Sequence, residues 1–309
     1  MSGGWIAGSV RAQLLASERR LGPVGARRLA SSPSRPAAVA ALGRTPYGRE
    51  VSLDLGLAGA QRAVAAATLL NLRVLAGWLP GEALGLLRSL AAWFELVNLE
   101  DRVAYLAGTE LRRPFELGAL AVAWPRAAEA QSVDELRRVL SVTAWGDPDG
   151  LTPAQLSLGL RLAWARRVDA EAPEARRWAA GAVALLIARE LFVAGVPVDL
   201  LPVPELTFIG RDWRSAPTFA RFAATLPPDA AWTFDGVETP DDLWRAKSAW
   251  WRRVETDAES LVHGSVAGRG VVVGAAALLA ADAHRTAAAL EAVARRGLPG
   301  AEEAFDAAA

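Results

Sequence analysis

The sequence has no cysteine and very little lysine, histidine or tyrosine. Without a thiol, the 309-residue chain can form no disulfide, no thiolate metal site and no cysteine nucleophile. The only histidines, His263 and His284, are 21 residues apart, whereas zinc needs three or four ligands that usually lie at short spacing. We therefore expect neither a cofactor nor a metal in this chain.

Long apolar runs and an excess of one charge are also missing. The longest uninterrupted apolar segments, 178–188 and 271–281, have eleven residues each, and a bilayer needs about 20. The first residues lack a charged start followed by an apolar block, so we expect no signal peptide. The 34 basic and 34 acidic side chains cancel, which argues against a nucleic-acid binder, because such proteins neutralise phosphates. The expected location is the cytoplasm, with only peripheral membrane contact.

What the chain does contain is an abundance of alanine, leucine and arginine, which are strong helix formers. Ser132 and Thr152 each stand three residues before Glu or Gln, which is the capping-box pattern of a helix start. Thr239 precedes a proline and two acids, which also suits a helix start. Convincing strand alternation is absent. The sequence predicts an all-α protein.

One stretch, residues 241–259, sets three tryptophans among basic side chains. Its apolar residues, among them Leu243, Trp250 and Val254, follow the three-four spacing of an amphipathic helix, and the charges cover the other face. A core helix and a surface that stacks nucleic-acid bases both fit this pattern. We favour the core helix because aromatic stripes mostly pack and the net charge is zero.

The same stretch has an internal echo, because AWWRRVETD at 249–257 resembles AWARRVDAE at 163–171. Other features recur in the same order: a Leu-Gly element, a capped short helix that leads to an aromatic residue, and an apolar helix with one acid. Their markers are, in turn, Gly22, Gly118 and Gly210; Tyr47, Trp145 and Trp232; and Glu95, Glu190 and Asp282. Recurrence in one register indicates an internal repeat.

These markers predict three pseudo-symmetric units of roughly 90 residues. Residues 49–150 and 151–238 form two of them. The third is split between the chain ends: residues 239–309 supply its first half, and residues 1–48 supply the half that is missing. We expect the N-terminal half to pack on the C-terminal half and to close the arrangement.

Three motifs carry a resemblance to a known family: LGRTPYG at 42–48, TAWG at 143–146 and ELVNL at 95–99. Together with the triplication, they make the chain resemble the central-stalk socket proteins of the archaeal- and vacuolar-type rotary ATPases, the C-type and, in eukaryotes, d-type family. The resemblance covers about residues 5–300. It implies an all-helical funnel of three similar domains without a catalytic site. Its implied partners are the central-shaft subunits and the membrane-embedded proteolipid ring, and its implied role is the coupling of ATP turnover to ion (proton) transport.

No enzyme motif competes with this interpretation. The segment GRGVVVG at 268–274 has neither the Gly-Lys-Ser/Thr of a P-loop nor a preceding strand, so we expect a loop that enters an apolar helix. The paired acids at 134–135 and 241–242 fall in first helical turns, where acids stabilise the helix end. We expect no catalytic residue.

The candidate partner-binding residues are arginines in two inter-helix loops at equivalent places of the repeat, Arg112 with Arg113 and Arg211 with Arg214. They are interpreted either as solvated loop charges or as a charged surface that faces a partner. Two functions remain open from the sequence: a socket in the rotor of a rotary ATPase, and an all-helical interaction scaffold of the same ancestry that has lost the motor.

Overall fold

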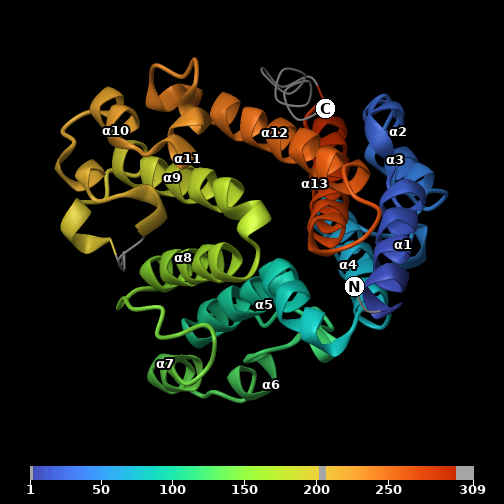
Figure 1. Cartoon of the computed structure of the whole chain (residues 1–309), viewed down its shortest axis with the longest axis horizontal. Helices are drawn as coiled ribbons and strands as arrows, with labels where there is room; N and C mark the ends of the chain where they lie inside the picture. The colour runs from blue at the N-terminus through green and yellow to red at the C-terminus, as the bar shows by residue number, and fades with distance from the viewer. Residues whose placement is uncertain (1–2, 202–206, 297–309) are drawn as a thin grey trace. The chain divides into compact units, whose positions relative to one another are not determined.

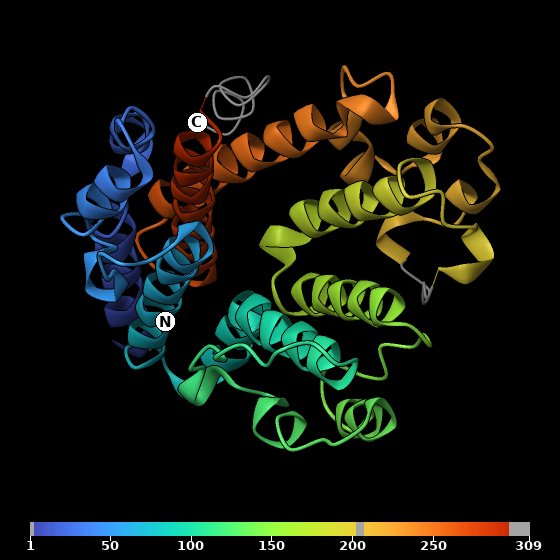
Figure 2. The same ribbon diagram turned by 180° about the vertical axis from the view of Figure 1, so that it is seen from behind.

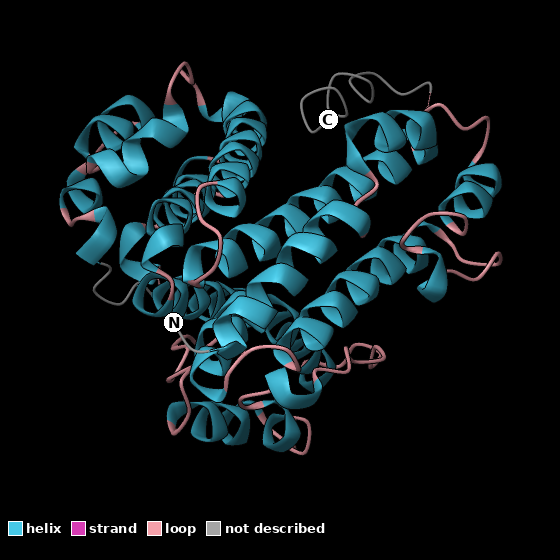
Figure 3. Ribbon diagram, turned by 45° about the vertical axis from the view of Figure 1, so that its right-hand side comes forward, coloured by secondary structure: helices cyan, strands magenta, loops and turns pink. Residues whose placement is uncertain are grey.

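The computed structural model describes residues 3–201 and 207–296, and these residues form α-helices, 3-10 turns and loops without a strand (Figure 3). The prediction of an all-α protein is confirmed. The helices belong to two compact units. One unit combines Met1–Ala83 with Trp251–Ala309, and the other is Leu84–Trp250. The division into three units, with bounds at 48, 150 and 238, stays a prediction.

The first unit is built around its last helix, α13 (Arg269–Ala294). Four helices from the N-terminal part of the chain pack on α13 (Figure 1): α1 (Gly3–Glu18), α2 (Gly22–Ala30), α3 (Arg35–Leu42) and α4 (Leu57–Ala76). Short 3-10 turns lie at Gly48–Glu50 and Gly81–Ala83. The core joins Leu42 and Tyr47 to Leu290 and Val293. Segments from the two ends of the sequence therefore share one hydrophobic core.

Helix α13 is the one helix among residues 3–201 and 207–296 that is long and apolar enough to cross a membrane. In its most apolar window, 67% of the residues are buried inside the structure. A helix that is apolar on all sides is typical of the centre of a core as well as of a membrane span, so this finding is weak evidence for a span. The segment 268–274, for which the sequence predicts a loop, is helical from Arg269 onward, and only Gly268 precedes the helix as its N-cap. Gly274 permits close packing on helix α12 (Leu243–His263), because a Cβ there would lie 2.6 Å from the Ala258 carbonyl oxygen.

The second unit is a series of long helices with short ones between them (Figure 2). Its long helices are α5 (Leu84–Leu106), α8 (Pro153–Glu171) and α9 (Arg176–Phe192), and α5 packs on α8, which packs on α9. Its short helices are α6 (Trp124–Ala127), α7 (Val133–Ser141), α10 (Phe219–Thr225) and α11 (Pro228–Ala231). The first part of α12, as far as Trp250, also belongs to this unit. The 3-10 turns are Gly118–Leu120, Pro173–Ala175, Val198–Leu200, Thr207–Ile209, Asp212–Ser215, Trp232–Phe234 and Pro240–Asp242.

The helix starts follow the capping signals of the sequence, with one difference. Thr152 and Gln155 form a full capping box at α8, and the Ser132 hydroxyl accepts from the Glu135 N–H at 3.2 Å. Thr239 was expected to cap α12. Its hydroxyl instead donates to the Asp242 carboxylate at 3.0 Å, and a 3-10 turn precedes the helix. The threonine hydroxyl thus donates to a carboxylate three residues ahead and accepts from no N–H group of the helix start.

Trp164 and Trp250, at equivalent places of the repeated stretch, are half-buried and face neighbouring helices of the second unit. The indole N–H of Trp164 donates to the Ser89 carbonyl at 3.1 Å, and that of Trp250 donates to the Trp178 carbonyl at 2.9 Å. The Trp164 ring also packs edge-to-face on Trp93, with ring centroids 5.2 Å apart. These two side chains are packing residues that keep part of their surface open to solvent, whereas Trp244 is 40% exposed.

One packing relation occurs three times. Each occurrence has, in order, a helix with a marked acid, a short helix with a hydroxyl cap, and a long helix. The helix with the acid packs on the long helix. The pairs are α13 with α4, α5 with α8, and α9 with α12 through Gly181 and Trp250. The hydroxyl caps of the short helices, Ser34, Ser132 and Thr218, recur in the same order.

Candidate functional site

The predicted arginines lie in two exposed loops of the second unit. Arg112 and Arg113 follow α5. The guanidinium of Arg112 lies 3.6 Å from the Asp101 carboxylate, and that of Arg113 lies 3.3 Å from Glu116. Arg211 precedes the turn Asp212–Ser215 and Arg214 lies within it, and the guanidinium carbon of Arg214 lies 5.5 Å from the Trp213 ring centroid. Each pair has local contacts, and a role in partner binding stays a prediction.

The loop that carries Arg112 and Arg113 is anchored by Asn98, the asparagine of the ELVNL motif. The Asn98 side chain is fully buried, and its amide donates to the Phe115 carbonyl at 3.0 Å. The Phe115 N–H donates back to Asn98 Oδ1 at 2.7 Å. This two-way contact satisfies one backbone donor and one acceptor in a segment without regular structure. The motif therefore fixes the position of the candidate arginine loop.

Asp282, in the middle of α13, is a buried hydrogen-bond acceptor for two separate segments. Its carboxylate accepts from the Leu21 N–H at 2.6 Å and from the Gly22 N–H at 2.7 Å. The Tyr47 hydroxyl donates to the same carboxylate at 2.7 Å. Gly22 has φ +73°, a conformation that favours glycine. One side chain thus holds the start of α2 and Tyr47, five residues beyond the end of α3, on the core helix.

Glu95, in the middle of α5, repeats this arrangement in the other unit. Its Oε1 accepts from the N–H groups of Val122, Ala123 and Trp124 at 2.8, 2.7 and 2.7 Å, at the start of α6. Its Oε2 accepts from the indole N–H of Trp145 at 2.9 Å. Both carboxylates therefore bind a helix start and the aromatic residue of the recurring short helix. We call each arrangement a carboxylate junction, centred on Asp282 or on Glu95.

The two junctions correct one equivalence suggested by the sequence. The sequence predicts that Gly22, Gly118 and Gly210 are matching positions, and all three have positive φ, at +73°, +56° and +70°. By its contact with the carboxylate, however, Gly22 corresponds to the N–H groups of residues 122–124 rather than to Gly118. The sequence therefore aligns the glycine turns with each other, whereas the hydrogen bonds to the two carboxylates align the start of α2 with the start of α6.

The third marked acid, Glu190, has a different environment. Its side chain is partly buried, with 20% of its surface exposed, and lies 3.9 Å from the guanidinium of Arg189. Nearby, Phe192 packs edge-to-face on Phe219 and Phe222, with centroids 5.7 and 5.6 Å apart. The indole N–H of Trp232 donates to the Asp229 carbonyl at 2.8 Å. An aromatic cluster therefore joins the short helix to the long helix at this place.

Each junction has a second buried polar residue three positions further along its helix. Beside Glu95 this residue is Asn98. Beside Asp282 it is Arg285, whose side chain is 5% exposed, lies 3.8 Å from the Asp282 carboxylate and pairs with Glu255 of α12. A buried guanidinium offsets the charge of the carboxylates around it. The acids could be identified because they recur in the sequence. Arg285 could not, because the sequence of an apolar helix does not show which residue will pair with a polar side chain in it.

We expect the unit that contains Tyr47 to lose stability in alkaline solution. Burial, followed by the charge of Asp282, raises the pKa of Tyr47 above its ordinary value of 10.0, so the folded protein keeps a proton that the unfolded chain releases. The contribution is complete below about pH 10 and is lost as the pH rises, at about 1.4 kcal/mol per pH unit. Urea unfolding between pH 8 and pH 11 measures this slope.

The matched variants for this prediction change the two tyrosines one at a time. Tyr47→Phe removes the proton that resists release, so its unfolding free energy should fall less steeply above pH 10. Tyr105→Phe alters an exposed tyrosine and should keep the slope of the unchanged protein. Equal slopes in all three proteins would contradict the prediction.

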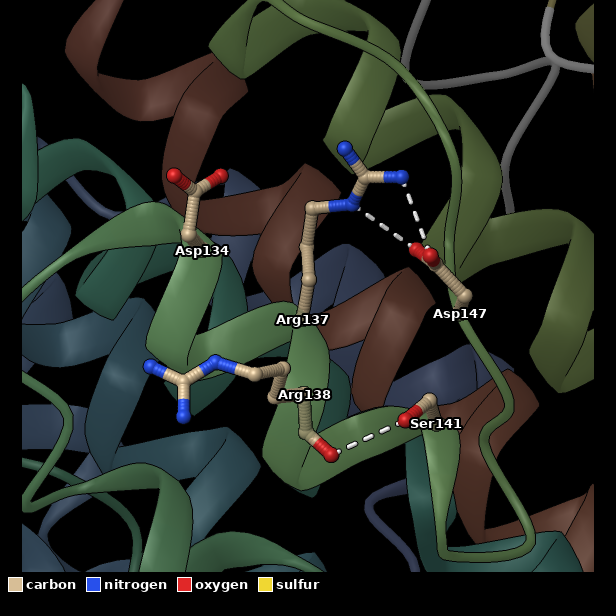
Figure 4. A pocket seen from close by; sticks show the side chains of 5 residues that line it. All are labelled: Asp134, Arg137, Arg138, Ser141 and Asp147. Carbon is tan, nitrogen blue, oxygen red and sulfur yellow. Dashed lines mark hydrogen bonds and ion pairs between the residues drawn. The ribbon is translucent and has the colours of Figure 1, made fainter.

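A shallow surface pocket lies along α7 (Figure 4). It encloses about 240 Å³ and is lined by Asp134, Arg137, Arg138, Ser141 and Asp147. Arg137 forms two hydrogen bonds of 2.9 Å to Asp147, and these lower the pKa of Asp147 below its ordinary value. Small-molecule sites are usually larger, at about 300–1,000 Å³. The pocket is therefore a shallow depression beside the Arg137–Asp147 ion pair and is smaller than a usual small-molecule site.

The two histidines are structural within their unit. The His284 ring stacks on Trp251 with centroids 4.5 Å apart, and His263 Nδ1 lies 2.8 Å from the Glu259 carbonyl of its own helix. In the described ranges, no group of three or more His, Asp or Glu residues could hold a metal ion. No protein-family model matches the chain, and no curated protein matches it either.

Proposed function

We propose that this chain is the non-catalytic central-stalk subunit of a vacuolar- or archaeal-type rotary ATPase. It would act as a socket that couples the central shaft to the proteolipid ring during ATP-driven ion (proton) transport, at the cytoplasmic face of the membrane. The observation that carries the proposal is the carboxylate junction, which is built on Glu95 and again on Asp282. Both acids occupy the recurring helix type on which the resemblance to the socket family rests.

The junctions suit a part that transmits torque. Such a part needs no chemistry of its own, but it must resist shear between its helices. Each junction joins three segments through short, buried hydrogen bonds, and breaking such a network costs several kcal/mol. Because Glu95 and Asp282 lie near the middle of long helices, the joined segments cannot slide along them without losing these bonds.

The threefold part of the proposal is supported by recurrence. The acid-bearing helix packs on the next long helix in three places, and a hydroxyl-capped short helix follows in three places. We propose that these are three pseudo-symmetric units of a funnel. Residues 1–48 would complete the unit begun at 239–309, next to units 49–150 and 151–238. The exposed pairs Arg112–Arg113 and Arg211–Arg214 would face the shaft.

A second candidate is a scaffold of the same ancestry that binds other proteins without a motor. The observation that favours it is Glu190, whose side chain is 20% exposed and lies beside Arg189 while phenylalanines join the neighbouring helices. A protein that no longer binds a rotating shaft could lose the third junction and still keep its fold. The two candidate functions thus differ in what they require at Glu190: the socket favours a third junction there, and the scaffold does not need one.

Affinity purification from the native host tests the proposal. The tagged chain, extracted in mild detergent, should recover shaft and proteolipid proteins, because interfaces of this kind bury at least about 1,200 Å². The charge reversals Arg112→Glu with Arg113→Glu should weaken recovery of the shaft, whereas Arg27→Glu with Arg28→Glu, two exposed arginines of α2, should not. Recovery of soluble, unrelated proteins alone would reject the socket and leave the scaffold.

A further inference from the structure

The outer surface formed by α2, α3 and the residues beside them carries charge of one sign. Residues 19–49 contain seven arginines and no acidic residue, although basic and acidic side chains balance over the whole chain. Because seven of the 34 basic side chains lie here, the rest of the chain holds 27 against all 34 acidic ones. Six of the seven arginines are exposed: Arg19, Arg27, Arg28, Arg35, Arg44 and Arg49. We call these six side chains the arginine surface.

The fold leaves this surface without a counter-charge. Helices α2 and α3 pack side by side on α13 (Figure 1), and the residues that they bury, such as Leu29 and Val39, are apolar. At the end of α2, the exposed Arg296 adds a further guanidinium, which donates to the Ala30 carbonyl at 2.8 Å. The seventh arginine, Arg20, lies 3.9 Å from a glutamate of α12. None of the six exposed ones forms an ion pair with another residue in the described ranges.

Helix ends account for only part of this charge. Arg27 and Arg28 lie in the last turn of α2, where cations offset the negative end of the helix dipole. Arg35 is the first residue of α3, where the same dipole disfavours a cation. Repulsion among arginines without acids between them also disfavours the compact chain. An anionic ligand therefore explains the surface better than the stability of the fold does.

The other exposed residues of this segment indicate which anion it binds. They are proline, serine, glycine, alanine and one valine, Val24, which is 61% exposed. The only aromatic residue, Tyr47, is buried, and the segment has no Asn or Gln. It therefore offers no ring that stacks on a nucleic-acid base and no amide that reads one. A twofold dimer would set the same positive surface against itself. A negatively charged lipid surface meets neither objection.

We infer that the arginine surface binds the anionic lipid headgroups of a membrane. The guanidinium group suits them because it donates two parallel hydrogen bonds to one phosphate. Val24 lies three and four residues before Arg27 and Arg28, on the same side of α2, and would enter the headgroup layer as an apolar contact. The inference rests on the proposed function, which places the chain at the cytoplasmic face of the membrane, where the surface potential is negative.

Sedimentation of the full chain with phospholipid vesicles tests the inference. The chain should bind vesicles that contain phosphatidylserine but not vesicles of phosphatidylcholine alone, and added salt should weaken binding. Arg27→Gln with Arg28→Gln should weaken binding about thirtyfold, because each arginine near an anionic membrane contributes about a factor of five. Arg35→Gln should weaken it about fivefold. Because the helix dipole disfavours Arg35, this variant should also keep the thermal stability of the unchanged protein.

The matched control is Arg112→Gln with Arg113→Gln. It removes the same charge from two exposed arginines that lie near Asp101 and Glu116, so it should leave vesicle binding unchanged. Equal losses in both pairs of substitutions, or no binding to phosphatidylserine vesicles, would overturn the inference. Tighter binding to a DNA duplex or to polyglutamate than to these vesicles would assign the surface to another polyanion and would also overturn it.

Two further comparisons locate the cause of a failure. If vesicle binding appears only in Glu302→Gln with Glu303→Gln, acids of this chain compete for the surface and the inference is wrong. A chain that recovers shaft and proteolipid proteins but binds no vesicles would overturn the inference alone. A chain that binds vesicles through Arg27 and Arg28 but recovers neither protein would overturn the proposed function and keep the lipid-binding surface.

Discussion

Replacing Glu95 with alanine is expected to destabilise the unit Leu84–Trp250 by about 3–5 kcal/mol, the range for breaking a buried polar network. The glutamate is fully buried and accepts from three backbone N–H groups and from the Trp145 indole. Alanine leaves these donors without an acceptor in a site that excludes water. Urea unfolding followed by tryptophan fluorescence measures the loss. Glu116→Ala removes a side chain that is 72% exposed and should change stability by less than about 0.5 kcal/mol.

Glu95→Gln separates the two halves of this junction. Glutamine keeps one oxygen for the N–H groups of residues 122–124 but turns an amide N–H toward the indole N–H of Trp145. Two donors then face each other, and the expected cost is about 1–3 kcal/mol. Trp145→Phe in the glutamine variant removes the opposing donor, so the double variant should lose less stability than the sum of the single variants. Strict additivity would show that the indole does not bind this carboxylate.

Replacing Asp282 with alanine is expected to have an effect of similar size, about 3–5 kcal/mol, in the other unit. The carboxylate is 1% exposed, joins Leu21, Gly22 and Tyr47 to α13, and lies beside the buried Arg285. Its loss leaves the start of α2 unattached and removes a negative charge that faces the guanidinium. We therefore expect α2 and α3 to open more often than the rest of the chain.

Hydrogen exchange measures this local effect. In Asp282→Ala, the amides of residues 22–47 should exchange faster, whereas those of α8 should keep the rates of the unchanged protein. Asp54→Ala, at an exposed aspartate, is the matched control and should leave all rates unchanged. A uniform increase in exchange along the chain would contradict a junction that acts on the N-terminal helices alone.

Local features of the candidate sites could be predicted from the sequence, whereas contacts between distant residues could not. The caps at Ser132 and Thr152 were predictable because the hydroxyl and the N–H that it binds lie three residues apart. Thr239 was not, because its hydroxyl donates to the Asp242 carboxylate, at an equally short distance, and accepts from no N–H group of the helix start. The recurrence of Glu95 and Asp282 was visible in the sequence as a register of acids. Their partners were not, because Trp145 lies 50 residues from Glu95, and Tyr47 lies 235 residues from Asp282.

The sequence by itself determined that the chain is helical, where several of its helices begin, and which positions recur. These are properties of helix propensity, capping and hydrophobic spacing, which act over a few residues. Only the tertiary structure decided that two of the three marked acids become buried junctions while Glu190 stays partly exposed beside Arg189, and that Ile6, Val10 and Leu14 of α1 are exposed. Burial and hydrogen-bond partners depend on which distant helix fills the space beside a residue, and that is settled when the helices pack against one another.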